Sequence, residues 1–257
     1  MSRWASRPAG PALGALAGQH PFPALGVPPS AGVGFWDEFL TTAGSVVASR
    51  YGDRFWTPTT IGGAPTYTSQ NPAANSEAGI LQAVTTSIAN EGSVLTLGTV
   101  APFYRFPPVG SIYCVKMNLT SGTTNYNLWA GFASAAATVA VADATQFIGI
   151  RSVGGNLFGV LKDGAAAGNE STVDLGVDCE GAWVIAGFEI KSGPSVQFFT
   201  MTSPSDLHTW DATYVGSPQT TNYPTAVCFP VLGCVTLSVT PKTIQWDFVG
   251  LGGKTGR

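Results

Sequence analysis

Two short aromatic stretches near opposite ends of the chain constrain its fold more than any other feature. Residues 244–249 (IQWDFV) alternate apolar with polar side chains at a period of two, and residues 35–40 (FWDEFL) combine aromatic and acidic side chains around the same Trp-Asp step. This alternation is typical of β-strands with one buried face and one wet face. We predict that the two stretches lie side by side as the first and last strands of one closed domain. Residues that precede Phe35 then lie outside that domain.

Between these stretches, short runs of branched and aromatic residues alternate with turn residues. The runs that we expect to be strands are 45–56, 79–84, 94–97, 111–119, 126–132, 146–151, 157–161, 183–190, 195–200, 227–229 and 235–239. The triplet 154–156 (GGN) has the chemistry of a hairpin turn. Only 134–144 and 205–210 could hold a helix. The sequence therefore predicts an all-β fold, an antiparallel jelly-roll β-sandwich over residues 34–250.

The first 33 residues differ from the rest in composition. Six prolines are interleaved with five glycines there, a mixture that breaks helices and cannot pair in a central strand. We predict an extended N-terminal arm over residues 1–33, with a secretory signal as the competing interpretation. The apolar residues that we expect to dock on neighbouring subunits are Trp4, Leu13, Leu16, Phe22 and Leu25. Residues 251–257 are rich in glycine and are predicted to form a flexible tail.

Charge is scarce along the whole chain and limits the classes of partner. Charged residues make up 11% of the sequence, against about 25% in an average soluble domain, and the net charge is −3. Lysines and arginines are scattered singly, so no basic stripe could follow a phosphate backbone. No run of apolar residues is long enough to span a bilayer. We therefore expect neither a nucleic acid nor a membrane as partner, and a protein much of whose surface is covered by other subunits.

The four cysteines lack the Cys-x-x-Cys spacing of metal and redox sites. Cys114, Cys228 and Cys234 lie inside apolar runs, Cys179 lies between Asp178 and Glu180, and we expect all four to be buried free thiols. Cys228 and Cys234 are separated by a Phe-Pro-Val-Leu-Gly segment that could be a turn. A disulfide across that turn stays open as an alternative.

The order of these elements resembles the concanavalin-like, laminin-G-like jelly rolls of virion proteins from tailed bacteriophages. The motifs that carry the resemblance, over about residues 34–250, are FWDEFL at 35–40, Trp56, the Gly62-Gly63 pair, WAGF at 129–132, FIGIR at 147–151, the Trp-initiated strand 183–190, VQFF at 196–199 and WDF at 246–248. Each motif is weak alone, and their order carries the likeness. The resemblance implies a structural protein of the virion, in the capsid or the tail.

The sequence contains no recognisable catalytic motif. A glycosidase needs two carboxylates facing the scissile bond, but no Glu-x-Asp-x-x-Glu run exists, and Asp174 and Asp178 are expected to bracket a turn. The two histidines, His20 and His208, have no Gly-x-Ser-x-Gly partner and are too few for zinc. Loop aspartates that could bind calcium are Asp143, Asp163, Asp206 and Asp211. We expect no catalytic residues, no specific metal and no cofactor.

Carbohydrate binding is the main functional alternative, since exposed aromatic rings stack on sugar rings. The aromatic residues in polar, loop-like surroundings are Tyr67, Trp210, Tyr214 and Tyr223. By contrast, the tryptophans within strand patterns are expected in the core, because large aromatics dominate the area buried in a sandwich; these are Trp36, Trp56, Trp129, Trp183 and Trp246.

The sequence thus favours a non-enzymatic virion protein, most simply a capsid decoration or cement protein. The expected partners are the major capsid protein or tail proteins. The expected assembly is a homo-oligomer, a trimer by analogy with shell symmetry. The alternative is a tail-associated receptor-binding module that recognises host glycans.

Overall fold

A computed structural model of the chain describes residues 35–37, 39, 56–63, 65–69, 80–97, 110–121, 124–134, 146–192, 195–201, 212–226 and 228–252. The predicted arm with its five docking residues, both histidines, Trp210 and residues 253–257 lie outside this part of the chain. So do the two segments predicted as helices, apart from Ser134.

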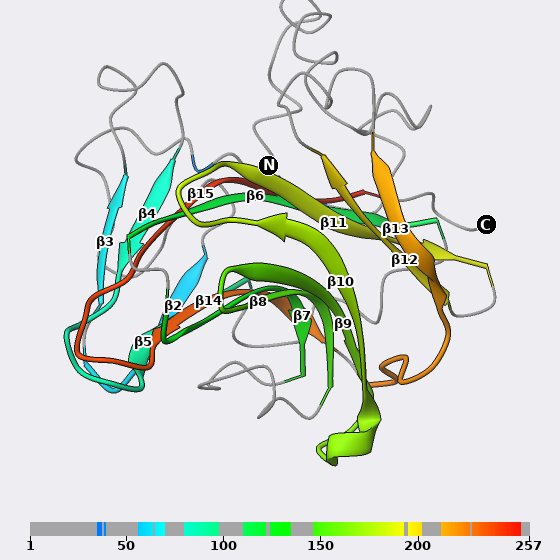
Figure 1. Ribbon diagram of the computed structural model, residues 1–257, viewed down its shortest axis with the longest axis horizontal. Helices are drawn as coiled ribbons and strands as arrows, with labels where there is room; N and C mark the ends of the chain where they lie inside the picture. Colours follow the sequence, from blue (N-terminus) through cyan, green and yellow to red (C-terminus); the bar gives the residue numbers. More distant parts are fainter. Residues whose placement is uncertain are drawn as a thin grey trace, which may run out of the picture.

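Two antiparallel sheets pack face to face in the described residues (Figure 1). The eight-stranded sheet has the order β13-β12-β11-β6-β15-β4-β3, and β1 pairs with β15 beside this path. Its strands are β1 (Phe35–Asp37), β3 (Thr66–Ser69), β4 (Leu81–Val84), β6 (Ile112–Ser121), β11 (Val184–Lys191), β12 (Ser195–Met201), β13 (Thr213–Gln219) and β15 (Thr243–Gly252). The predicted all-β jelly-roll sandwich is confirmed.

The second sheet has seven strands in the order β10-β9-β8-β7-β14-β5-β2. They are β2 (Thr57–Ile61), β5 (Glu91–Thr96), β7 (Tyr126–Ala133), β8 (Phe147–Val153), β9 (Asn156–Lys162), β10 (Glu170–Asp178) and β14 (Phe229–Thr236). A single 3₁₀ turn, η3 (Ala167–Asn169), lies between β9 and β10. Both sheets bend in the same sense, so the outer face of the seven-stranded sheet lies on the inside of the bend (Figure 1).

The two aromatic stretches lie side by side, as predicted. β1 pairs antiparallel with β15, with Phe35 opposite Leu251 and Asp37 opposite Val249. β1 therefore pairs with residues 249–251, in the second half of β15. The first half of β15, residues 243–246, pairs with β4 instead. Leu251 and Gly252 are buried members of β15, so the tail that we placed from residue 251 can begin only after Gly252.

Aromatic side chains from both sheets meet in the core between them. Tyr113 of β6 stacks on Phe188 of β11, with ring centroids 5.1 Å apart. Phe132, from β7 of the opposite sheet, meets Tyr113 edge to face at 5.5 Å. Trp56 and Trp246 are fully buried in the same cluster, as predicted for tryptophans in strand patterns. Because a buried large apolar side chain contributes about 1.5–3 kcal/mol, this cluster holds the two sheets together.

Glycines let flat rings lie directly on the seven-stranded sheet. Trp129 in β7 and Gly233 in β14 are opposite each other. A Cβ atom at Gly233 would come within 2.1 Å of Trp129 Cε2, so the indole occupies the space that a side chain would need. Trp129 is 2% exposed, again as predicted.

Two segments, one that could have been a turn and one that we predicted to be a turn, lie in strands. Residues 228–234 do not form a turn, because β14 runs through Pro230 and Gly233 without interruption. The Pro230 carbonyl accepts a hydrogen bond from the Leu97 amide, 3.1 Å away, so its nitrogen faces the end of β5, where the ladder needs no donor. All four cysteines are buried and free, so Cys228 and Cys234 are not bridged.

The turn predicted at Asp174 and Asp178 is also wrong. Both residues lie in β10, which has a register shift between them, with Gly176 at a φ of +67°. By contrast, the predicted hairpin after β8 is present, with positive φ at Gly154 and Gly155, 58° and 92°. Two successive positive φ angles are what a two-residue hairpin turn requires.

Candidate functional site: the Tyr214 patch

The structure separates the predicted glycan-stacking tyrosines by exposure. Tyr214 is 41% exposed, on the outer face of the eight-stranded sheet, and it lies in β13 rather than in a loop. Tyr67 and Tyr223 are half-buried and pack against the core. Burial raises the pKa of the Tyr223 hydroxyl to about 12. Tyr214 is therefore the described residue of this set with an accessible ring, while Trp210 lies outside the described residues.

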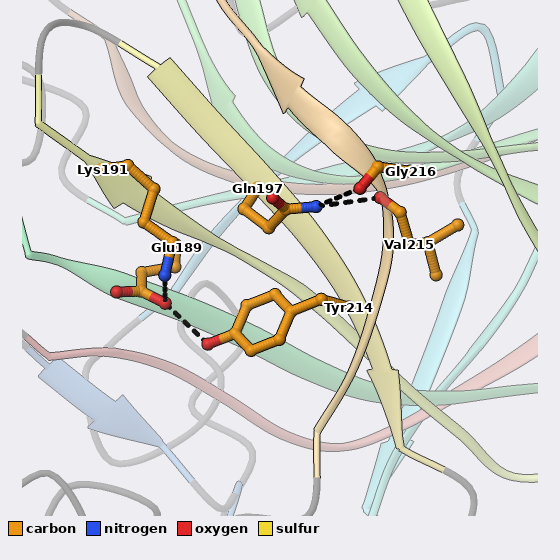
Figure 2. A network of polar contacts seen from close by, with 6 residues as sticks. All are labelled: Glu189, Lys191, Gln197, Tyr214, Val215 and Gly216. Atoms are coloured by element: carbon orange, nitrogen blue, oxygen red, sulfur yellow. Dashed lines mark hydrogen bonds and ion pairs between the residues drawn. The ribbon is translucent and has the colours of Figure 1, made fainter.

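Polar side chains from two neighbouring strands, β11 and β12, lie on the same side of the sheet as this ring (Figure 2). The Tyr214 hydroxyl donates a 2.6 Å hydrogen bond to Glu189 Oε2. Lys191 forms an ion pair with the same carboxylate oxygen, and its Nζ lies 4.8 Å from the centroid of the Tyr214 ring. We call Tyr214, Glu189, Lys191 and Gln197 the Tyr214 patch.

Strand register brings these residues together from distant parts of the sequence. Glu189 of β11 is opposite Gln197 of β12, so both side chains point to the same face of the sheet. Tyr214 is opposite Phe199, two residues further along β12 and on that same face. The Phe199 ring supports Tyr214 edge to face, with centroids 5.9 Å apart. Glu189 therefore fixes the hydroxyl of Tyr214, and Phe199 fixes the position of its ring.

Gln197 determines the course of the strand that carries Tyr214. Its side-chain amide donates to the carbonyls of Val215, at 3.1 Å, and Gly216, at 2.7 Å (Figure 2). Gly216 has a φ of +64° and lies at the register shift between β12 and β13. Because Gln197 is only 7% exposed, its amide is a buried clamp on this bulge rather than a free ligand group.

A second charged cluster lies on the same outer face. Lys116 Nζ is 2.6 Å from Asp247 Oδ2 and lies 5.0 Å from the centroid of the Trp183 ring. The Lys116 side chain is 3% exposed and that of Asp247 15%. Trp183 is half-buried, in part departing from the predicted core position. The cluster is largely hidden, and we interpret it as structural.

The aromatic side chains on the outer face of the seven-stranded sheet are less exposed to solvent than Tyr214. Trp129 and Phe147 are buried, and Phe158 is half-buried. Arg151 Nη2 contacts Glu170 Oε1 at 2.6 Å beside them. Within the described part of this face, no aromatic ring is as exposed as that of Tyr214.

Metal-binding chemistry finds no support in the described residues. No group of three His, Cys, Asp or Glu side chains is placed there to hold an ion. Asp163 is the only one of the four predicted calcium candidates in this part of the chain. The helical residues of the described part likewise include no segment long and apolar enough to cross a bilayer.

Comparisons with known proteins show the fold and not the family. No protein-family model matches the chain, and no curated protein matches it in sequence. Among solved structures, a protein of unknown function from Shewanella oneidensis superposes with a TM-score of 0.56 at 14% identity, covering 86% of this chain and 87% of that one.

Two enzymes are similar to the same extent. The β-glucanase of Bacillus licheniformis superposes with a TM-score of 0.52 at 14% identity, covering 86% of this chain and 98% of that one. A prokaryotic β-1,3-1,4-glucanase from a mouse hindgut metagenome gives 0.53 at 12% identity, covering 86% and 99%. The chain is thus a jelly-roll sandwich of the concanavalin-like, glucanase type in fold.

These similarities correct the prediction that the protein is not an enzyme. That prediction relied on the missing Glu-x-Asp-x-x-Glu run, which tests only acids placed along one strand. In a sandwich, chemistry also assembles across strands, as Glu189 and Tyr214 do here. With glucanases among the proteins of the same fold, the absent motif gives no ground for excluding catalysis.

Proposed function

We propose that this protein binds carbohydrate and that the Tyr214 patch is a contact surface for the sugar. The observation that carries the proposal is an exposed aromatic ring beside a carboxylate and an ammonium group. Sugar rings present C–H groups on one face and hydroxyls at their edge. The face of an aromatic ring can pack against the C–H groups, and a few well-positioned polar groups can hydrogen-bond the hydroxyls.

The fold supports this proposal by analogy alone. Proteins named as β-glucanases share the jelly-roll sandwich, so the architecture is compatible with polysaccharide ligands. The residues of the Tyr214 patch carry the argument for this chain independently of those enzymes.

A glycan array followed by titration calorimetry on the best ligand tests the proposal. Tyr214→Ala should reduce affinity at least tenfold, because it removes the ring and the hydroxyl together. Leu237→Ala is a matched control, since Leu237 is 39% exposed but lies between β14 and β15. Binding that is equal in wild type and Tyr214→Ala, or no glycan bound by the wild type, would refute the proposal.

A parallel assay with the same proteins measures hydrolysis of the glycan. Incubation with β-glucans and detection of released reducing ends shows whether binding leads to bond cleavage. Glu189→Gln is the informative variant, because it retains the shape of the side chain while removing its charge.

Attachment to a phage virion is our second proposal, and it rests on the sequence. The proline- and glycine-rich arm over residues 1–33 could lie across several neighbouring subunits, as tethered segments do. The low charge suits a protein whose faces meet capsid or tail proteins, because interface cores are poor in charge. Deleting residues 1–33 should abolish attachment to particles and leave the domain folded. Retained attachment would contradict this role, and light scattering would give the number of copies.

A further inference from the structure

The two oxygens of the Glu189 carboxylate are not equivalent. The Tyr214 hydroxyl and Lys191 Nζ both contact Oε2 (Figure 2). Oε1 takes part in neither contact. A carboxylate oxygen accepts about two hydrogen bonds, so Oε1 retains acceptor capacity beside the exposed ring. The side chain is 19% exposed, which leaves it within reach of a ligand.

Lys191 supplies the complementary group. An ammonium has three donors, and contact with Glu189 uses one of them. Its side chain is 36% exposed, and Nζ lies over the Tyr214 ring. A ligand that reaches the ring therefore meets an acceptor and a donor next to each other.

The Tyr214 patch carries no net charge. One carboxylate and one ammonium compensate each other, and Tyr214 and Gln197 carry no charge. An anionic ligand would gain from Lys191 but be repelled by Glu189 at nearly the same distance. A cationic ligand faces the reverse balance. The patch thus offers paired hydrogen-bonding groups without excess charge of either sign.

Resting on the carbohydrate-binding function proposed above, we infer that the Tyr214 patch selects neutral sugars with two adjacent hydroxyls. One hydroxyl donates to Glu189 Oε1, and its neighbour accepts from Lys191 Nζ. Each hydroxyl can play either part. Hydrogen bonds to charged partners are stronger than neutral ones, which gives this pair its weight in the affinity. Because Glu189 and Phe199 already hold the ring, little ordering is required on binding.

The test compares neutral glycans with the same glycans capped by an acidic sugar. Wild type should bind the neutral members at least tenfold more tightly. Lys191→Met should weaken binding of neutral glycans about tenfold, since one charge-assisted hydrogen bond is lost.

Glu189→Gln provides the sharper measurement, because it leaves Lys191 without its compensating charge. This variant should lose affinity for neutral glycans and gain it for acidic ones, inverting or abolishing the preference. Tyr214→Phe retains the ring and removes only the hydroxyl contact, which isolates the contribution of that contact. Circular dichroism of every variant checks that it is folded.

The outcomes separate the two levels of the argument. Tyr214-dependent binding with a preference for acidic glycans, or a preference unchanged in Glu189→Gln, overturns the inference while carbohydrate binding stands. Binding that ignores Tyr214 altogether overturns the proposed function itself.

Discussion

Replacing Gly233 with alanine tests the packing of the seven-stranded sheet most directly. The new Cβ would lie 2.1 Å from Trp129 Cε2, 2.3 Å from Cζ2 and 2.5 Å from Nε1. Non-bonded carbon atoms prefer about 3.5–4.0 Å, so the indole would have to move by more than about 1 Å. Trp129 is 2% exposed, and that space is occupied by its neighbours.

The expected cost follows from this overlap. Overpacking a filled interior costs about 1–3 kcal/mol, and a displaced indole belongs at the upper end of that range. For a domain of this size, each kcal/mol lowers the melting temperature by about 2–4 °C. We therefore expect Gly233→Ala to lower the free energy of unfolding by about 3 kcal/mol, a fall of roughly 6–12 °C in melting temperature.

Urea denaturation of a double-mutant cycle provides the assay. Gly168→Ala is the control, because a Cβ there meets nothing within 4 Å, and it should stay within about 0.5 kcal/mol of wild type. Trp129→Leu alone should destabilise, but in that background Gly233→Ala should cost much less. If Gly233→Ala behaves like Gly168→Ala, or if its cost is the same with and without Trp129, the indole does not occupy that space as described.

Three further perturbations follow from buried polar groups. Asp247→Asn removes the carboxylate that lies 2.6 Å from the buried Lys116 ammonium and should cost about 3–5 kcal/mol in urea denaturation, whereas adding Lys116→Met should recover much of it. Burial raises the pKa of the Cys179 and Cys234 thiols to about 12, so their stabilising contribution is complete below the unfolded value near 8.5 and is lost as pH rises from there toward 12. Stability should fall between pH 8.5 and 11, and a pH-independent denaturation midpoint would contradict this. Tyr126→Phe removes hydrogen bonds of 2.8 and 3.0 Å and should cost about 1–2 kcal/mol, and an unchanged midpoint would show that water replaces them.

Strands with alternating side chains and clear turn residues could be predicted from the sequence. β6, β7, β8 and β9 appear close to their predicted bounds, since each has a buried face of branched and aromatic residues. β14 could not be predicted in one piece, because Pro230 and Gly233 are residues that end strands elsewhere. Only the position of β5 shows that Pro230 faces the end of a ladder, and only Trp129 shows what fills the space over Gly233.

Edge strands were missed for a different reason. β10 has Val173, Leu175 and Val177 at a period of two, a signal that Gly176 and the acidic residues on its exposed face obscured. β13 is largely exposed, so little in its composition marks it as a strand.

The candidate site was predictable only in part. An aromatic residue in polar sequence surroundings identified Tyr214. Glu189 and Lys191 had no local signal, because their proximity to Tyr214 depends on the register of three strands. That register is a property of the folded sheet and cannot be inferred from any one segment.

The closing strand has a consequence for how the molecule assembles. β15 pairs with β6 along one edge and with β4 and β1 along the other, so it joins the two parts of the eight-stranded sheet. During synthesis from the amino terminus, β1, β4 and β6 all emerge before the strand that joins them. Until β15 arrives, their edges are open to any other extended chain. β15 is the last of the described strands to be made, and the eight-stranded sheet is complete only once it has paired.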